Sequence, residues 1–501
     1  MLARALVIDA LAFLAALILS LLLTPAIRDF AIRRRYVDVA GSVRKIHKQA
    51  IPRLGGVAIF TAWLIAAGTS FSIDPSLREV FWSNRPRTIV FVMGGVAAAA
   101  LGFVDDLRRL RARYKLVVQL AIGVMLCWAG FTVHELQLPG AIVLPLGPFG
   151  APLTVLWIAG VMNALNLIDG LDGLAGGIAA IALAALFAFG ILLGKPLLAL
   201  YSAALAGGVI GFLVYNFNPA SIFMGDAGSL LLGYYLAVAS LRSSQPIGAT
   251  AVEVAVPVLI LGLPICDMAL AICRRALRGR GVFSPDREHL HHRLLARGFS
   301  QKQAALILWG AAGILTAGGI AAALGGGMVD VIVALCAVGA AGCFAWRVRI
   351  QLSLESLGKE RRENQELRTA VTDILRRLDR ATALDDVIQT MEKVPPIVSA
   401  AAVRTHIGEI VPDQKEQNGG EERLRMRFSL AEGPDRLGHL ELAWDDGRAK
   451  IEEFHALALE EICDYVARTV RRVSPSVIPF PAPSPAVATP PVRRLLRVGR
   501  N

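Results

Sequence analysis

Long, repeated apolar runs with few charges constrain this chain most strongly. The 501 residues have a mean hydropathy of +0.55, and only 18% of them are charged. A run that crosses a bilayer must satisfy its backbone N–H and C=O groups internally, so it folds as a helix. We therefore predict an all-α polytopic membrane protein. About eleven transmembrane helices are expected from run length, at 5–26, 54–72, 88–104, 116–133, 152–168, 174–194, 196–214, 227–243, 250–273, 303–324 and 327–346.

Basic residues indicate the orientation of these helices. They gather after the first, third and ninth expected helices, in 27–53, 105–115 and 274–297, whereas 73–87 blurs the pattern. By the positive-inside rule these three loops are cytoplasmic, and so is the long C-terminal part. The formal charge of +12 fits topology signals and anionic ligands better than nucleic acid. The scattered cysteines support neither a disulfide framework nor a zinc site. The polar clusters all fall on the predicted cytoplasmic side, which indicates one composite site: 38–56, 105–115, 163–173, 215–229 and 286–293.

The segment 215–233, YNFNPASIFMGDAGSLLLG, carries one acid, Asp226, between two apolar runs. A carboxylate at the end of a membrane helix is costly unless it binds something. The small residues around it let backbone amides and a ligand come close. We interpret Asp226 as a metal ligand that faces the cytoplasm; a helix boundary with a solvated Asp is the alternative.

Amides and acids also gather in 163–177, NALNLIDGLDGLAGG. Asn163 and Asn166 are three apart and share a helix face, and Asp169 and Asp172 follow in a glycine-broken turn. Such oxygen ligands suit Mg²⁺. The alternative is a polar loop between helices that supplies helix caps.

The acid pair Asp105–Asp106 ends the third expected helix. Adjacent carboxylates there can bind a divalent cation or handle a proton, and Lys115 downstream can hold a phosphate. A solvated acid pair beside basic neighbours is the alternative.

The loop after the ninth expected helix ends in DREHLHHRLLARG. The spacing of its histidines matches no familiar zinc signature. We expect it to contact phosphate or close over a diphosphate rather than bind metal, and a solvated basic loop is the alternative. The residues concerned are His289, His291, His292 and Arg293.

Together, the motifs resemble the polyprenyl-phosphate N-acetylhexosamine-1-phosphate transferases, membrane enzymes that start bacterial cell-envelope glycan synthesis. The resemblance covers about residues 1–350 and rests on PRLGGVAIF, GFVDDLRRL, NALNLIDGLDGLAGG, YNFNPASIFMGDAGSLLLGY and HLHHRLL in this order. HLHHR is similar to the WecA-type branch, whereas the MraY-type loop runs HHHFE. A UDP-N-acetylhexosamine, with N-acetylglucosamine first, is therefore expected as donor ahead of UDP-muramoyl-pentapeptide.

The resemblance also implies roles for individual residues. Asp226 corresponds to the Mg²⁺ ligand, with Asn166 beside the same metal–diphosphate centre and Mn²⁺ as the substitute ion. Asp105 and Asp106 correspond to the acid pair beside the acceptor phosphate, and Lys115 to a phosphate contact. Asp169 corresponds to an essential acid. Positions around the uracil correspond to Gly170, Leu171, Asp172, Asn216 and Phe223. The loop that folds over the diphosphate and sugar corresponds to His289, His291, His292 and Arg293.

The implied reaction transfers N-acetylhexosamine 1-phosphate from a UDP-sugar to undecaprenyl phosphate and releases UMP. The resemblance places it at the cytoplasmic face of the bacterial inner membrane, in contact with membrane lipid. Two anions must meet, so we expect catalysis to rest on charge neutralisation by Mg²⁺, Lys115 and the His/Arg loop. Asp105 would position or deprotonate the acceptor. A membrane transporter and a membrane-anchored sensor are the alternatives.

Composition changes after Arg349, which ends the predicted transmembrane transferase domain, 1–349. Residues 350–380 are predicted to form a charged helix or a short coiled coil, and the latter leaves a homodimer open. The heptad seam comprises Leu357, Asn364, Leu367, Val371, Ile374 and Leu378.

Residues 381–473 are predicted to form a small cytoplasmic α+β domain that resembles a GAF-type sensor or dimerisation domain. Within it, 423–432 and 437–446 alternate like paired strands, between helical segments. The tail 474–501 is Pro-rich with a basic end, and is predicted to be disordered.

Overall fold

The computed structural model divides into two compact units, one comprising Met1–Ala40, His47–Arg275 and Val282–Gln351, the other Gly41–Ile46, Ala276–Gly281 and Leu352–Asn501. The structure describes residues 2–34, 36–38, 51–108, 110–138, 142–243, 259–278, 289–325, 339, 354–407, 424–432, 435–444, 451 and 453–475.

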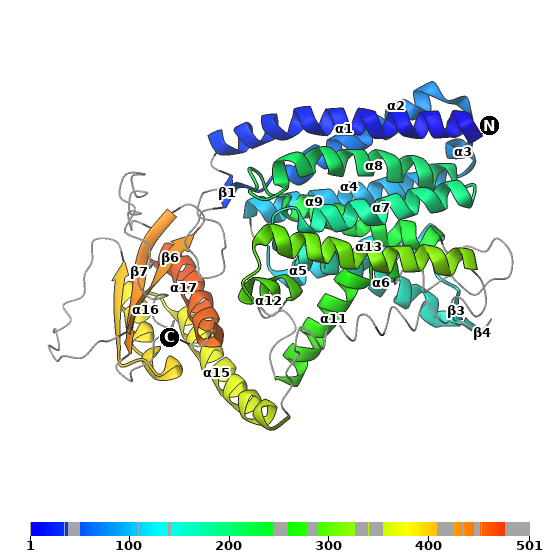
Figure 1. Cartoon of the computed structure of the whole chain (residues 1–501). Helices are drawn as coiled ribbons and strands as arrows, with labels where there is room; N and C mark the ends of the chain where they lie inside the picture. Colours follow the sequence, from blue (N-terminus) through cyan, green and yellow to red (C-terminus); the bar gives the residue numbers. More distant parts are fainter. Residues whose placement is uncertain are drawn as a thin grey trace, which may run out of the picture. The chain divides into compact units, whose positions relative to one another are not determined.

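Helices make up most of the first unit (Figure 1). They are α1 (Leu2–Arg33), α2 (Gly55–Ile73), α3 (Pro75–Ser83), α4 (Arg85–Arg108), α5 (Ala112–Trp128), α6 (Gly150–Ile168), α7 (Leu174–Leu192), α8 (Pro196–Asn216), α9 (Gly225–Ser243), α11 (Gly262–Leu277), α12 (Leu290–Ala296) and α13 (Gln301–Gly325). Two short antiparallel pairs, which the sequence did not predict, are β1 (Val37–Asp38) with β2 (Ile51–Pro52), and β3 (Glu135–Leu138) with β4 (Ile142–Pro145).

Within the described part of the chain, seven helices are long and apolar enough to cross a membrane. They are Ala3–Arg33, Gly55–Ile73, Arg85–Arg108, Gly147–Ile168, Leu174–Leu192, Pro196–Asn216 and Gln301–Ala321. The prediction of a mainly helical chain with several membrane-spanning helices is thus confirmed, whereas the number eleven stays a prediction. Three other expected segments overlap α5, α9 and α11, which are not among the seven; residues 250–258 of the expected segment 250–273 lie outside the described residues. The last, 327–346, lies outside the described residues except for residue 339.

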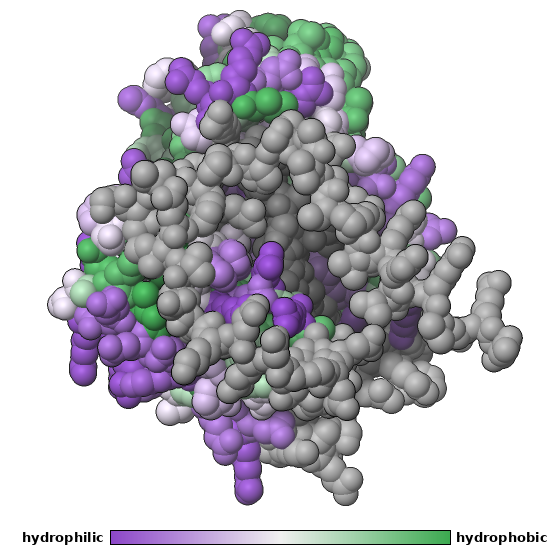
Figure 2. All heavy atoms as spheres, turned by 90° about the vertical axis from the view of Figure 1, so that its left-hand side faces the viewer, coloured by the Kyte–Doolittle hydropathy of each residue, from purple (hydrophilic) through white to green (hydrophobic). Residues whose placement is uncertain are grey.

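Apolar side chains also cover the outside of these helices, as a lipid environment requires. On α1, for example, Leu11, Ile18 and Leu22 are exposed. Figure 2 is a view from the side on which α1 ends. At the top of the picture, hydrophilic residues lie in front of and beside hydrophobic ones. A helix with an exposed apolar flank and a basic end suits a membrane boundary.

Glycines bring α9 close to α2 and α4. A Cβ on Gly56 of α2 would lie 2.0 Å from the backbone nitrogen of Gly228, and one on Gly102 of α4 would lie 2.2 Å from the carbonyl oxygen of Asp226. Small residues permit such close helix packing in membrane proteins. The start of α9, which carries Asp226, is therefore held directly against both helices.

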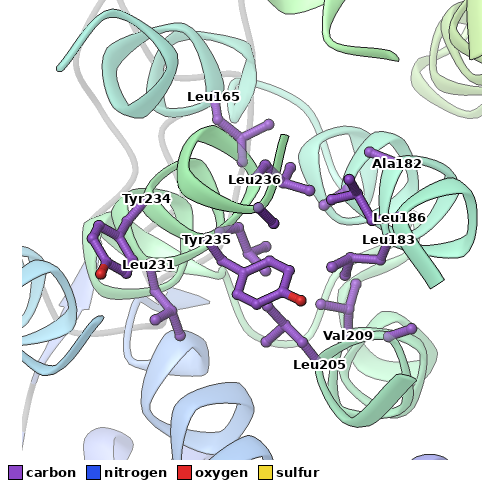
Figure 3. Packing of buried hydrophobic residues seen from close by; sticks show 14 of the residues in the cluster. Leu165, Ala182, Leu183, Leu186, Leu205, Val209, Leu231, Tyr234, Tyr235 and Leu236 are labelled. Carbon is purple, nitrogen blue, oxygen red and sulfur yellow. The ribbon is translucent and has the colours of Figure 1, made fainter. Parts of the chain in front are cut away.

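The middle of α9 is buried among α6, α7 and α8, where leucines and alanines surround two tyrosines (Figure 3). The Tyr234 hydroxyl donates to the Phe91 carbonyl at 2.6 Å, and the Tyr235 hydroxyl pairs with that of Ser202 at 2.7 Å. Both buried hydroxyls thus have partners, which avoids the cost of an unsatisfied polar group. This packing makes α9 a fixed support for the acid at its start.

The second unit contains α15 (Leu354–Arg380), α16 (Leu384–Met391), α17 (Glu453–Val473) and an antiparallel sheet in the order β5-β7-β6. The strands are β5 (Ala402–Ile407), β6 (Leu424–Glu432) and β7 (Asp435–Trp444). The two alternating segments of the sequence are β6 and β7, whereas β5 was not predicted. Of the predicted tail 474–501, residues 476–501 lie outside the described residues.

Four positions of the heptad seam of α15 pack inside this second unit. Leu367, Val371, Ile374 and Leu378 are buried in one core with Leu459 and Val466 of α17. On the strands, Leu440, Leu442 and Trp444 alternate with partly exposed residues, as expected for a sheet with one covered face.

Candidate active site

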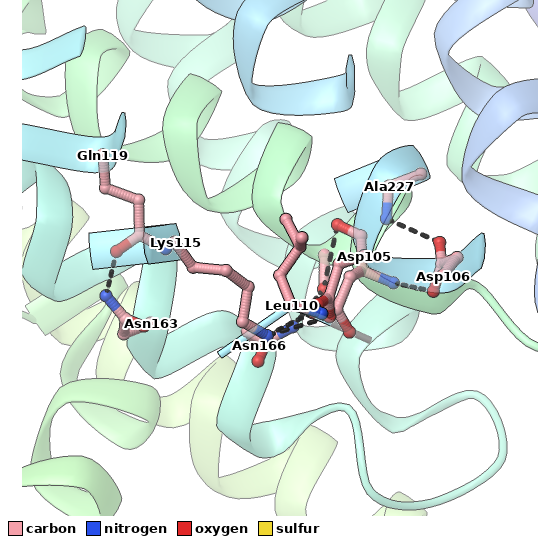
Figure 4. Close-up of polar contacts among 10 residues, drawn as sticks. Asp105, Asp106, Leu110, Lys115, Gln119, Asn163, Asn166 and Ala227 are labelled. Carbon is pink, nitrogen blue, oxygen red and sulfur yellow. Dashed lines mark hydrogen bonds and ion pairs between the residues drawn. The ribbon is translucent and has the colours of Figure 1, made fainter. Parts of the chain in front are cut away.

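The start of α9 is capped by Asp106 at the end of α4. Its Oδ1 accepts the backbone N–H of Asp226 at 2.9 Å, and its Oδ2 accepts that of Ala227 at 3.0 Å. The first N–H groups of a helix have no partner within the helix, and a carboxylate there is also favoured by the helix dipole. Gly225, with φ +72°, allows the turn that brings these groups together. Asp106 therefore fixes the position of Asp226 (Figure 4).

Lys115 of α5 lies between two carboxylates, those of Asp105 and Asp226. Its Nζ lies 3.0 Å from Asp105 Oδ2 and 2.8 Å from Asp226 Oδ2. Asp105 also accepts the backbone N–H of Leu110 through Oδ1 at 2.6 Å. These side chains are between 12% and 25% exposed, so their charges are partly screened from water yet open to a ligand. The adjacent acids Asp105 and Asp106 thus have different partners: one holds a lysine and the other caps a helix.

Two asparagines of α6 lie near the Asp105–Lys115–Asp226 cluster. Asn166 donates to the Ser229 hydroxyl of α9 at 2.9 Å and also hydrogen-bonds the Asp226 carboxylate. Asn163, one turn earlier, donates to Gln119 of α5 at 2.6 Å (Figure 4). The two asparagines expected on one face thus have different partners: Asn166 reaches Asp226, whereas Asn163 reaches α5.

The turn between α6 and α7 is tied to the loop before α9. Asp172 Oδ2 accepts from Asn218 Nδ2 at 2.8 Å and from the Ala220 N–H at 3.0 Å. Asn216 accepts the Gly173 N–H at 3.1 Å and donates to the Ile222 carbonyl at 2.9 Å. The structure thus shows that Asp172 and Asn216, two of the residues expected around the uracil, hold the two loops in place; their contact with uracil stays a prediction.

The predicted Phe223 lies in the same loop. Its backbone N–H donates to the Pro52 carbonyl at 2.7 Å, and its carbonyl accepts the Gly55 N–H at 3.0 Å. The loop before α9 is therefore bonded to the segment that leads into α2 as well as to the α6–α7 turn.

Asp169 lies at the start of the α6–α7 turn, and the charge of Asp226 in the cluster affects its pKa. Burial, and then the negative charge of Asp226, raise the pKa of Asp169 to about 7, and the positive charge of Arg53 opposes this rise. Arg53 was counted in the sequence only as an orientation signal. The position of Arg53 in the PRLGG motif is the sequence feature that could have indicated its place near the site.

The histidine segment begins α12 and approaches the same turn. A Cβ on Gly170 would lie 2.5 Å from His291 Nε2, so His291 packs directly on the turn. Burial lowers the pKa of His291 to about 3, which keeps its ring neutral. The His291 and His292 rings are 4.3 Å apart, and Arg293 follows on α12.

The sequence analysis missed Asp267 of α11. This buried acid lies 3.0 Å from His289 Nδ1. The signal that was present is a single acid inside an apolar run, where an ionisable group is costly without a partner.

Residues 88–244 match the model of the family described as glycosyl transferase family 4. A protein of Bacillus subtilis (strain 168), named "Probable undecaprenyl-phosphate N-acetylglucosaminyl 1-phosphate transferase", is 36% identical over 299 residues, which cover 60% of this chain and 80% of that protein. The chain belongs to this family of polyprenyl-phosphate sugar-1-phosphate transferases. In this transferase, the matched range runs from the first turn of α4 to the end of α9, and Asp267 and α12 lie beyond it.

Two further relatives of the transferase agree. "Decaprenyl-phosphate N-acetylglucosaminephosphotransferase" of Mycobacterium tuberculosis (strain CDC 1551 / Oshkosh) is 34% identical over 55% of this chain and 73% of its own length. "Undecaprenyl-phosphate alpha-N-acetylglucosaminyl 1-phosphate transferase" of Salmonella typhi is 31% identical over 59% and 78%. The predicted family is thus confirmed. The transporter and sensor alternatives gain no support, because these relatives are named as transferases.

Proposed function

We propose that this chain transfers N-acetylglucosamine 1-phosphate from UDP-N-acetylglucosamine to undecaprenyl phosphate and releases UMP. The observation that carries the proposal is the Asp105–Lys115–Asp226 cluster, which joins the ends of α4, α5 and α9 beside the α6–α7 turn. The names of the relatives support the acceptor and the sugar.

In the reaction, an oxygen of the acceptor phosphate attacks the β-phosphorus of the donor. The bond from that phosphorus to the oxygen shared with the α-phosphate breaks, and UMP leaves with this oxygen. Phosphate monoesters are largely ionised at neutral pH, with a second pKa of about 6, so the attack needs no strong base. Lys115 contacts a phosphate oxygen, and Asp105 positions the acceptor through Lys115. Fixed charges of this kind stabilise phosphoryl transfer mainly by electrostatics.

Asp226 and Asn166 would hold Mg²⁺, for which Mn²⁺ would substitute. Among the described residues no three His, Cys, Asp or Glu side chains come together as a metal site. This fits Mg²⁺, which commonly takes only one or two carboxylates and completes its shell with substrate phosphates and water. Asp226 is 25% exposed and Asn166 hydrogen-bonds its carboxylate, so two side chains that carry oxygen donors lie together. The bound ion would neutralise charge on the diphosphate.

We place the reaction at the cytoplasmic face of the bacterial inner membrane. The support is the basic character of the loops that flank the acid cluster, together with the lipid acceptor named for the relatives. The donor and UMP are water-soluble and the acceptor stays in the bilayer, which suits a site at helix ends.

The test is UMP release by the full chain in lipid nanodiscs, with undecaprenyl phosphate and a panel of UDP-N-acetylglucosamine, UDP-N-acetylgalactosamine and UDP-glucose. We expect a lipid-linked product from UDP-N-acetylglucosamine first, loss of turnover with EDTA, and recovery with Mg²⁺ or Mn²⁺. A folded protein that forms no product from any donor would refute the function. Turnover that persists in EDTA would refute the metal alone.

A further inference from the structure

Asp267 of α11 is 2% exposed, and both of its carboxylate oxygens have partners in the histidine segment. Oδ1 accepts the backbone N–H of Leu290 at 3.0 Å, and Oδ2 lies 3.0 Å from His289 Nδ1. A carboxylate this deeply buried is strongly unfavourable unless it is paired and hydrogen-bonded. Asp267 therefore links α11 to the first residue of α12 through a side chain and through the backbone.

The contact selects the state of the His289 ring. A ring nitrogen that faces a carboxylate carries the proton, so Nδ1–H donates to Asp267 and Nε2 is left for a second partner. Among the described residues, Asp267 of α11 and His291 of α12 are the titratable groups that face this ring.

The row of contacts continues from the His289 ring toward the α6–α7 turn. The rings of His289 and His291 are parallel to within 3°, with centroids 5.8 Å apart. His291 packs on Gly170, and its Nδ1 is buried without a hydrogen-bond partner among the described residues. A row of side chains thus runs from Asp267 through two histidines to the α6–α7 turn that carries Asp169 and Asp172.

We propose that Asp267 is a positioning residue for the transferase reaction, which sets the ring nitrogen that His289 presents and anchors the start of α12. This inference rests on the proposed function and on the expectation from the sequence that the histidine segment contacts the diphosphate. A plain anchor of α12 needs only an acceptor for the Leu290 N–H. A positioning residue needs the negative charge as well, and the two roles separate experimentally.

The substitution Asp267→Asn keeps an oxygen for Leu290 and replaces the carboxylate that faces His289 by a neutral amide. We expect the thermal stability and the KM for UDP-N-acetylglucosamine to change little and kcat to fall by about 10- to 100-fold, as for other partners that orient a histidine ligand. Asp267→Glu should recover part of the loss. Cys266→Ser, at the neighbouring exposed residue, is the matched control and should behave as wild type.

A double-mutant cycle with His289→Gln decides whether Asp267 acts through His289. If it does, Asp267→Asn costs much less in the His289→Gln background than in wild type, because coupled residues are not additive. Equal losses in both backgrounds, or wild-type kcat in Asp267→Asn, would overturn the inference. Equal falls in melting temperature for Asp267→Asn and Asp267→Ala would do the same, since they would show a purely structural role.

A readout that needs no turnover separates this inference from the proposed function. The 15N chemical shifts of the His289 ring nitrogens report which of the two carries the proton. We expect the proton on Nδ1 in the wild type and a larger share of it on Nε2 in Asp267→Asn, because an amide N–H beside Nδ1 needs an acceptor. The same proton position in both proteins would overturn the inference. If the wild type releases no UMP and the two proteins still differ in this way, the proposed function is refuted and the Asp267–His289 contact stands.

Discussion

Replacing Asp106 by alanine removes the acceptor of two backbone N–H groups at the start of α9. The two N–H groups belong to Asp226 and Ala227, and Asp106 caps the helix by accepting both. Loss of an N-cap costs about 0.5–2 kcal/mol, and a buried N–H left without a partner costs about 1–3 kcal/mol. We therefore expect Asp106→Ala to lower the free energy of unfolding by about 2–4 kcal/mol. Asp106→Asn, whose single amide oxygen satisfies one of the two donors, should cost about half as much.

The assay is thermal unfolding of the full chain together with UMP release. A change of 1 kcal/mol moves the melting temperature by about 2–4 °C in domains of about 150–250 residues, so Asp106→Ala should melt roughly 5–10 °C lower. Its turnover should fall as well, since Asp226 loses its fixed position. The matched control is Asp105→Asn, at the adjacent residue, which keeps an acceptor for Leu110 and loses the ion pair with Lys115.

We expect the two acids to separate in this experiment. Asp105→Asn should lose turnover with a small change in melting temperature, whereas Asp106→Ala should lose both. If Asp106→Ala melts like wild type, the capping argument is wrong. If Asp106→Asn keeps its stability and loses all turnover, Asp106 acts chemically, as the sequence analysis expected, and the structural role is secondary.

Three further predictions follow from other contacts. Lys115→Met leaves Asp105 and Asp226 without their shared ammonium, and UMP release should fall by about 100-fold or more, with partial activity in Lys115→Arg; wild-type turnover in Lys115→Met would contradict its role. Gly102→Ala forces a methyl group against the Asp226 carbonyl and should cost about 1–3 kcal/mol in thermal unfolding, whereas Gly68→Ala, which meets nothing within 4 Å, should not. The pKa of Asp169 is raised from 3.8 to about 7, so its ionisation opposes folding as the pH rises from about 4 to 7. In EDTA, Asp169→Asn should therefore stabilise the protein more at pH 8 than at pH 4, and an equal effect at both pH values would contradict the burial of this acid.

The sequence predicted much of the site because helix ends and basic loops determine which residues share a face of the membrane. Asp105, Lys115, Asn166 and Asp226 come from four different helices and were expected together on the cytoplasmic side; the structure brings them into contact. The orientation rule needs only charge counts and apolar run lengths. It places residues on a face but gives no information on which side chains touch.

For that reason, the distinct partners of Asp105 and Asp106 could not be predicted from the sequence. Adjacent residues on a helix point about 100° apart, so one of the two faces α9 and the other faces α5. Which is which depends on how α4 packs, and Gly102 sets that packing through its contact with α9. Asp267 was missed because its partner, His289, is 22 residues away, across a segment with no regular pattern. A contact of this kind has no signature in spacing.

The acid cluster carries an excess of negative charge when its carboxylates are ionised. Asp105, Asp106 and Asp226 carry three negative charges when ionised, and Lys115 returns one, which leaves two negative charges beside a site proposed for a diphosphate and a phosphate. Such a site repels both substrates unless positive charge is added. The α9 start offsets part of the Asp106 charge, and Arg53 acts on the Asp169 side. The remaining excess is what a divalent cation at Asp226 would neutralise. The donor should therefore bind much more weakly in EDTA than in Mg²⁺, and Asp226→Asn should weaken that dependence on the ion.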